Sequence, residues 1–254
     1  MKKILIIGIG AGDPDFVTVQ AARALNTVDV FFMLEKGSSK DAMVELRREI
    51  CRRYCTDKAY RVVEEPSPPR DTRPADYNAC VDDLNRAKQE RFERMIVDNL
   101  ADGQVGAVLA WGDPSIYDST IRNIEAIAAR QGIDYEVIPG ISAVQVLAAR
   151  HRITLNTVGQ PVEITTGRRL AEGWPAGVDS VVVMLDGIEA YRRFADQDID
   201  IYWGAYLGTP DEILIAGRLK DVSDEIHRVR AAARERIGWV MDTYLMRRRG
   251  IAPE

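Results

Sequence analysis

The chain has 254 residues, of which 46% are hydrophobic and 29% charged, and its formal net charge is −5. This length favours two domains of about 150 residues or fewer, and the composition excludes a disordered or fibrous chain. The acidic balance argues against a nucleic-acid partner, which requires clustered basic residues. No apolar stretch approaches the ~20 residues that span a bilayer, and no cleavage-site pattern follows Met1. We therefore expect a cytoplasmic protein without a membrane partner.

Cysteine and histidine are too few and too scattered for a metal site. Cys51, Cys55 and Cys80 form no CxxC pair, and the only histidines are His151 and His227. An odd number of cysteines without a secretion signal predicts reduced thiols rather than disulfides. A metal would need more ligands than these patterns supply.

The first half of the chain alternates strand and helix patterns, which is typical of an α/β domain with a mostly parallel sheet. A Pro-rich stretch from Pro66 to Pro74 interrupts the alternation and predicts a surface loop. The predicted strands are 4–7, 28–34, 105–111 and 135–138, and the predicted helices are 17–25, 41–51, 77–100 and 116–130.

The second half has shorter extended runs with few long crossovers, which predicts a mixed sheet. Its predicted strands are 162–166, 181–185, 201–207, 213–219 and 239–244, and its predicted helices are 143–150 and 222–236. The expected fold class is therefore α/β, with two α/β domains at 1–139 and 140–254.

The tripeptide Gly-Asp-Pro occurs twice, at Gly12-Asp13-Pro14 and at Gly112-Asp113-Pro114, each time after an apolar strand pattern. Glycine allows the backbone to approach a ligand or to take a positive φ. Aspartate followed by proline also suits the start of a helix. The repeated corner therefore indicates either two helix starts or a ligand site.

Two phosphate-binding loops are the nearest alternatives, and neither fits. Gly8-Ile9-Gly10 follows the first strand, but the third glycine of a dinucleotide fingerprint is replaced by Asp13. A carboxylate there would repel a pyrophosphate at a helix N-terminus. No Gly-Lys-Ser/Thr follows either corner, which excludes a Walker A loop. The pattern favours a ligand with little phosphate.

Three segments together resemble the signature loops of the tetrapyrrole (corrin/porphyrin) methylase family. They are Gly8 to Asp13 with Thr18, then Trp111 to Tyr117, then Val137 to Ala143. The resemblance continues through later segments such as 165–170, 183–187, 202–212 and 238–244, so it covers essentially the whole chain.

The resemblance implies a homodimer that holds S-adenosylmethionine in a cleft between two α/β domains and releases S-adenosylhomocysteine. Two departures affect the assignments, since many relatives have proline at the position of Ala11 and glycine in place of Asp186. Carried over by position, the cofactor-binding residues are Ala11, Trp111, Gly112, Asp113, Ile116, Ser142, Ala143, Leu185, Leu207 and Gly208.

The likeness over the full length also implies a reaction of cobalamin biosynthesis, the methylation of precorrin-5 at C1 with loss of acetate. Acetate release needs a group that handles a proton and donors for an oxyanion. Asp186 is the first candidate for the catalytic residue, followed by Asp118, Tyr206 and His151. Three other functions remain possible for the chain: another tetrapyrrole methylase, a nucleotide-dependent oxidoreductase, or a non-catalytic protein that binds a tetrapyrrole or a nucleotide.

The substrate bears many carboxylates, so arginines should line its site, because a guanidinium binds carboxylates in a bidentate manner. Arg168 and Arg169 follow a predicted strand and a glycine, and they are the first candidates. Tyr117, beside the second glycine loop, is a third candidate for substrate binding. Solvated arginines at a strand end remain the alternative.

Overall fold

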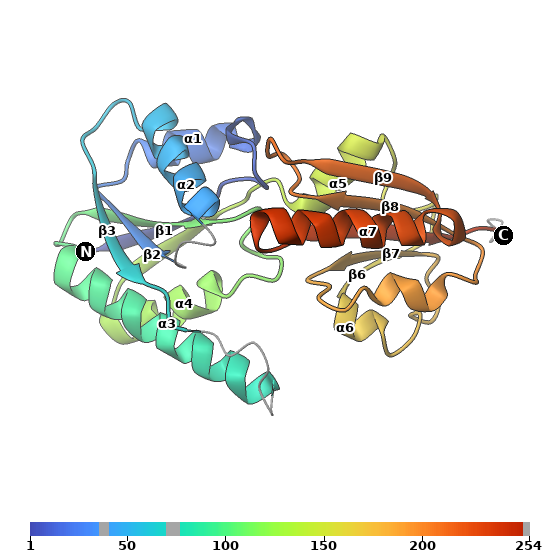
Figure 1. Cartoon of the computed structure of the whole chain (residues 1–254). Helices are drawn as coiled ribbons and strands as arrows, with labels where there is room; N and C mark the ends of the chain where they lie inside the picture. The colour runs from blue at the N-terminus through green and yellow to red at the C-terminus, as the bar shows by residue number, and fades with distance from the viewer. Residues whose placement is uncertain (36–40, 70–76, 251–254) are drawn as a thin grey trace. The chain divides into compact units, whose positions relative to one another are not determined.

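The computed structural model describes residues 1–35, 41–69 and 77–250. It divides the chain into two compact units, Met1–Ser142 (unit 1) and Ala143–Glu254 (unit 2). Each unit has one five-stranded sheet with helices packed on it (Figure 1). None of the helices in the described ranges is both long and apolar enough to cross a bilayer.

Unit 1 contains an all-parallel sheet with the strand order β3-β2-β4-β1-β5. Its central strands β1 and β4 are almost fully buried, as expected for strands that helices cover on both faces. The strands are β1 (Lys3–Gly8), β2 (Val30–Glu35), β3 (Arg61–Pro66), β4 (Val105–Ala110) and β5 (Asp134–Ile138).

The helices of unit 1 cover both faces of this sheet, two on each (Figure 1). Ala21 and Leu25 of α1 pack on one face together with α2, and Ile124 and Ile127 of α4 pack on the other together with α3. The chain therefore turns to one face after β1 and to the opposite face after β4. The helices are α1 (Val19–Leu25), α2 (Asp41–Tyr54), α3 (Tyr77–Asn99) and α4 (Thr120–Gln131).

Unit 2 contains a mixed sheet with the order β6-β7-β10-β8-β9, in which only β6 and β7 pair in parallel. Helix α7 packs on one face around the buried Trp203 and Tyr244, and α5 contacts β8 and β10. The elements are α5 (Ala143–His151), β6 (Val162–Thr166), α6 (Gly167–Leu170), β7 (Ser180–Met184), η3 (Ala190–Phe194), β8 (Ile199–Ala205), β9 (Ile213–Arg218), α7 (Leu219–Ile237) and β10 (Asp242–Arg248).

The predicted fold class, an α/β chain with a parallel and a mixed sheet, is confirmed, but several element predictions are wrong. The short helices α6 and η3 are not among the predicted elements, and Pro66 ends β3 instead of starting the predicted loop. Strand β3 was not expected, because its exposed alternation and terminal Pro66 mark it only as an edge strand. Helix α4 begins at Thr120 rather than at residue 116. Strand β10 begins at Asp242 rather than at residue 239 and continues to Arg248. Part of the predicted Pro-rich loop, 70–74, lies outside the described residues.

The two Gly-Asp-Pro corners start different local structures. Asp13 caps a single 3-10 turn (η1, Pro14–Phe16), and Thr18 then caps α1 separately by accepting from the N–H of Ala21. After Asp113 the chain makes turns instead, and α4 follows only at Thr120. The first Gly-Asp-Pro corner therefore starts a helix of only one short turn, and the second corner does not start a helix.

Candidate functional site

The three predicted loops of unit 1 meet at one edge of the sheet. They follow the carboxyl ends of β1, β4 and β5, and β1 pairs directly with both of the other strands. The chain also leaves β1 and β4 toward opposite faces. In an open α/β sheet, such a switch point at the carboxyl ends is where ligands bind.

Glycines allow these loops to touch through their backbones. Gly10 and Gly112 exchange two backbone hydrogen bonds, with N···O distances of 3.2 and 2.9 Å. A Cβ on Gly140 would lie 2.1 Å from the carbonyl oxygen of Gly112, and a Cβ on Gly8 would lie 2.5 Å from the nitrogen of Gly140. Close approach of the backbone, rather than turn geometry alone, therefore requires glycine at these positions.

The carboxylate of Asp113 joins the second loop to the third. Its Oδ1 accepts from the N–H of Ser115 at 2.8 Å and also from the Ser115 hydroxyl, and its Oδ2 accepts from the N–H of Gly140 at 2.8 Å. Burial alone would raise the pKa of Asp113, but the hydrogen bonds from Ser115 and Gly140 outweigh it and hold the pKa below its ordinary value. The side chain is therefore ionised near neutral pH and engaged in holding the two loops together.

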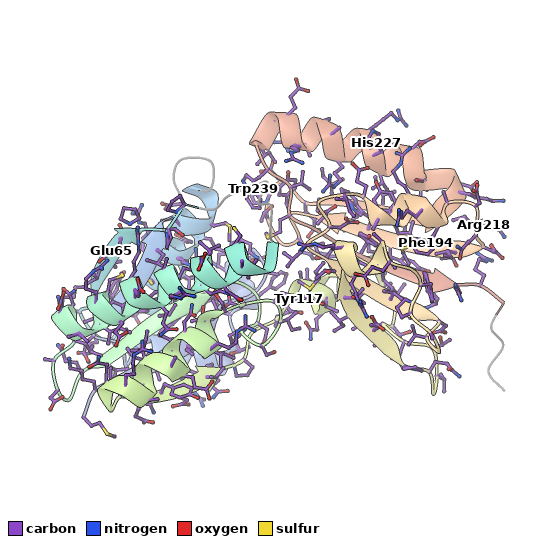
Figure 2. All side chains as sticks on the ribbon, turned by 90° about the horizontal axis from the view of Figure 1, so that it is seen from below. Glu65, Tyr117, Phe194, Arg218, His227 and Trp239 are labelled. Carbon is purple, nitrogen blue, oxygen red and sulfur yellow. The ribbon has the colours of Figure 1, made fainter. Side chains whose placement is uncertain are left out.

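The other residues predicted for the cofactor up to the end of the third loop lie in or beside these loops. Ala11 and Ser142 are buried, Ile116 is half-buried, and Ala143 begins α5. Tyr117, labelled in Figure 2, is exposed and has a φ of +50°. Strained backbone of this kind is concentrated at functional sites.

The loops suit a nucleoside ligand that carries little phosphate. The indole Nε1 of Trp111 is buried and finds no acceptor among the described residues, which is costly for a donor unless a ligand supplies one. The backbone takes positive φ values at Gly10, Gly12 and Gly112. No lysine or arginine occurs in the segments 8–13, 111–117 and 137–143. S-Adenosylmethionine, which has hydrogen-bond acceptors and no phosphate, fits these features.

In unit 2 the predicted site residues also gather at one edge of the sheet. Strands β7 and β8 flank β10 and are both antiparallel to it, so their carboxyl ends lie at the same edge. Leu185 follows β7 there, with a φ of +55° and 67% of its surface exposed. Leu207 and Gly208 follow β8, directly after Tyr206, which also has a positive φ.

Arg168 and Arg169 are brought to the same edge, because β6 runs parallel to β7 and Thr166 pairs with Met184. Both side chains are exposed on the short helix α6, and Arg169 forms an ion pair with Glu172. The structure thus brings the predicted residues together in two groups, one at the sheet edge of each unit.

Asp186 lies in a buried hydrogen-bond network. Its Oδ1 accepts from the N–H of Ile188 at 3.0 Å, and its Oδ2 accepts from the N–H of Ala190 at 2.8 Å and from the hydroxyl of Tyr244 at 2.6 Å. Burial and the adjacent Asp186 raise the pKa of Tyr244 well above its ordinary value, so the phenol remains a donor. The Asp186 side chain is only 3% exposed. These bonds suit a group that shapes the turn after β7.

Arg230 extends this network and was missed from the sequence. Its Nη2 donates to the carbonyl of Asp186 at 2.6 Å, its Nε to Oδ2 of Asp242 at 2.9 Å, and its Nη1 to Oε1 of Glu189 at 3.4 Å. Burial raises the pKa of Asp242, although Arg230 and Trp203 oppose the shift. The sequence does contain a pattern that points to Arg230, because this arginine interrupts the apolar face that Leu219, Ile226 and Ala233 form on α7.

The remaining candidates for the acetate-releasing residue each have a local partner. Oδ1 of Asp118 accepts from the N–H of Thr120 at 2.6 Å, at the start of α4. The hydroxyl of Tyr206 donates to the carbonyl of Trp239. The imidazole Nε2 of His151 lies 3.0 Å from the carbonyl of Trp203, and burial lowers the pKa of this histidine. None of these contacts distinguishes a catalytic group.

The family model of the tetrapyrrole (corrin/porphyrin) methylases matches residues 3–223. The chain belongs to this family. It is 51% identical over 250 residues to the precorrin-6A synthase [deacetylating] of Sinorhizobium sp., covering 98% of this chain and 96% of that protein. The family expected from the three loops is thereby confirmed.

Solved structures of the tetrapyrrole methylases have the same fold. The crystal structure of a cobalamin synthesis related protein, CobF, from Corynebacterium diphtheriae superposes with a TM-score of 0.81 at 34% identity, covering 97% of this methylase and 98% of that chain. A uroporphyrin-III C-methyltransferase from Thermus thermophilus, complexed with S-adenosylhomocysteine, has a TM-score of 0.58 at 18% identity, with 96% and 91% covered.

Proposed function

We propose that this tetrapyrrole methylase is an S-adenosylmethionine-dependent C-methyltransferase of cobalamin biosynthesis that methylates C1 of precorrin-5 and releases acetate. The observation that carries the proposal is the 51% identity, over nearly the whole chain, to a deacetylating precorrin-6A synthase. A nucleotide-dependent oxidoreductase is not favoured, because the first loop has Asp13 where a dinucleotide fingerprint has its third glycine.

The glycine loops hold the cofactor in this proposal, and their geometry suits that role. When bound, S-adenosylmethionine supplies a methyl group activated by its sulfonium. The protein has to keep donor and acceptor at near-attack distance, which rigid backbone loops do well. The bonds between Gly10 and Gly112 and from Gly140 to Asp113 supply that rigidity. The proposed cofactor-binding residues are those carried over above: Ala11, Trp111, Gly112, Asp113, Ile116, Ser142, Ala143, Leu185, Leu207 and Gly208.

Arg168, Arg169 and Tyr117 are the proposed substrate-binding residues, because all three are exposed beside segments that carry cofactor residues. The catalytic role of Asp186 stays a prediction. Its three accepted hydrogen bonds favour a different role, in which it positions the strained turn at Leu185.

The proposed enzyme is a cytoplasmic homodimer. The homodimer is what the likeness to the tetrapyrrole methylases implies. Light scattering should give twice the chain mass of 28.4 kDa. A monomer at micromolar concentration would contradict the dimer.

The reaction itself is tested by turnover with freshly generated precorrin-5. We expect one S-adenosylhomocysteine and one acetate for each macrocycle methylated, and calorimetry should detect binding of S-adenosylhomocysteine but not of NADH. Methylation without acetate would indicate another tetrapyrrole methylase. Binding of NADH alone would reject the proposal.

A further inference from the structure

Arg47 places a guanidinium where β2 and β4 separate. These two strands pair only at Val30–Gly106 and Phe31–Ala107, although β4 continues to Ala110. The carbonyl of Leu109 lies beyond this pairing, and within the described residues no residue of β2 pairs with Leu109. The Nε of Arg47 donates to this carbonyl at 3.2 Å, and Nη1 donates to the carbonyl of Met43 at 3.2 Å.

Arg47 differs from the other arginines of α2 in having no carboxylate partner among the described residues. Arg48 pairs with Glu64, Arg52 with Glu45 and Glu49, and Arg53 with Asp15. The Arg47 side chain is partly buried, and burial lowers the pKa of its guanidinium, a shift that the negative charge of Asp118 opposes. The carboxylate of Asp118 nevertheless does not form an ion pair with the guanidinium of Arg47. A guanidinium held away from water with only neutral acceptors is unfavourable unless an anion joins it.

A further buried donor lies two residues beyond Leu109. The buried indole N–H of Trp111 faces no acceptor among the described residues. The indole of Trp111 and the Leu109 carbonyl that Arg47 binds both lie at the carboxyl end of β4, the same sheet edge at which the glycine loops meet. This edge therefore presents a positive charge and N–H groups, Nη2 of Arg47 and Nε1 of Trp111, for which the described residues supply no acceptor.

We propose that Arg47 is a binding residue for a carboxylate of one of the methyl-transfer ligands, which it receives through Nη2, the nitrogen for which the described residues supply no acceptor. The inference rests on the proposed function. A guanidinium matches a carboxylate in charge and in bidentate geometry. Two ligands offer this chemistry, the amino-acid end of the cofactor and the acidic side chains of the tetrapyrrole.

Calorimetry on the full-length protein separates these sources with three probes. S-Adenosylhomocysteine carries the cofactor carboxylate, 5′-methylthioadenosine lacks it, and uroporphyrin III is a stable polycarboxylate macrocycle. Arg47→Met should weaken either S-adenosylhomocysteine or uroporphyrin by about tenfold to hundredfold, as expected for a hydrogen-bonded charge. The same variant should leave 5′-methylthioadenosine unchanged. Arg48→Met, the neighbouring variant whose arginine pairs with Glu64, should change none of the three.

Equal affinities of Arg47→Met and wild type for both carboxylate probes would overturn the inference, as would an equal loss for 5′-methylthioadenosine. If the Met variant does not fold, Arg47→Lys decides, since it keeps the charge but not the paired N–H groups. It should weaken the same carboxylate probe by about threefold to tenfold, and an unchanged affinity would reject the role. A wild-type protein that binds none of the probes would instead reject the proposed function.

Discussion

At the scale of single residues, the aspartates of the two Gly-Asp-Pro corners do different things. Asp13 accepts one local bond, from the N–H of Asp15 at 2.9 Å. Asp113 uses one oxygen in the equivalent turn and the other to hold Gly140, which lies 27 positions further along the chain. Identical tripeptides thus serve a local turn in one case and a contact between two loops in the other.

Asp113→Asn should weaken S-adenosylhomocysteine binding by about tenfold or more. An amide has only one oxygen, so keeping the bond from Ser115 places its NH₂ group against the N–H of Gly140. Asp13→Asn is the matched control, because one amide oxygen suffices for the bond from Asp15. Calorimetry on both variants checks the prediction, and equal affinities for the two would contradict it.

Asp186→Asn tests whether this carboxylate acts on the substrate or on its own turn. The variant replaces one carboxylate oxygen with NH₂, so either Ile188 or both Ala190 and Tyr244 lose their acceptor, and we expect a loss of about 1–3 kcal/mol in the free energy of unfolding. A positioning role predicts that acetate release and methyl transfer fall together while the KM for S-adenosylmethionine rises. Methyl transfer at the normal rate without acetate would instead support catalysis by Asp186.

At the scale of elements, Arg230 ties α7 to two other parts of unit 2. It reaches β10 through Asp242 and the turn after β7 through the carbonyl of Asp186 and the side chain of Glu189. His227, one turn earlier on α7 and labelled in Figure 2, also contacts Glu189, with Nδ1 2.7 Å from the carboxylate. The helix therefore supports a turn whose residues Leu185 and Glu189 both have positive φ.

Arg230→Met should lower the free energy of unfolding by about 3–5 kcal/mol, because it leaves the buried carboxylate of Asp242 without its charged partner. Arg228→Met, on the exposed side of the same helix, should change it by less than about 0.5 kcal/mol. Urea denaturation of both variants measures the difference. A small loss at Arg230 would mean that the network contributes little to the stability of unit 2.

The elements that could be predicted from the sequence are those whose environment is uniform along their length. Buried strands such as β1 and β4 are continuous apolar runs, whereas the edge strand β3 is polar and exposed and was missed. The start of α4 was misplaced because the turn that Asp113 makes with Ser115 does not continue into a helix, and the other carboxylate oxygen bonds to Gly140. That bond is tertiary, and no local pattern encodes it.

The same distinction applies to the candidate site. The need for glycine in the loops could be predicted, but the contact between Gly10 and Gly112 joins residues about a hundred positions apart. Arg47 and Arg230 were missed because the bonds that define them reach 62 and 44 positions along the chain, to Leu109 and Asp186. Charged residues that interrupt the apolar face of a helix remain the usable sequence signal for groups of this kind.

At the scale of the whole molecule, the net charge of −5 is at odds with a polycarboxylate substrate. Overall repulsion of like charges has to be overcome by basic groups concentrated at the site, since exposed charges act over about a Debye length of 8–10 Å. Arg168 and Arg169 are exposed at the edge of the unit 2 sheet where Leu185 and Gly208 also lie. They are therefore the proposed local source of attraction.

Reversing both charges, Arg168→Glu with Arg169→Glu, should raise the KM for the tetrapyrrole by about tenfold or more and change kcat little, because the loss falls on ground-state binding. Lys220→Glu with Arg228→Glu, on the exposed surface of α7, changes the net charge by the same amount away from this edge. Steady-state kinetics at low and at physiological salt should show the increase only for the arginine pair, and most strongly at low salt. An equal increase in both variants would assign the effect to overall charge, and an unchanged KM in the arginine pair would remove these residues from the substrate site.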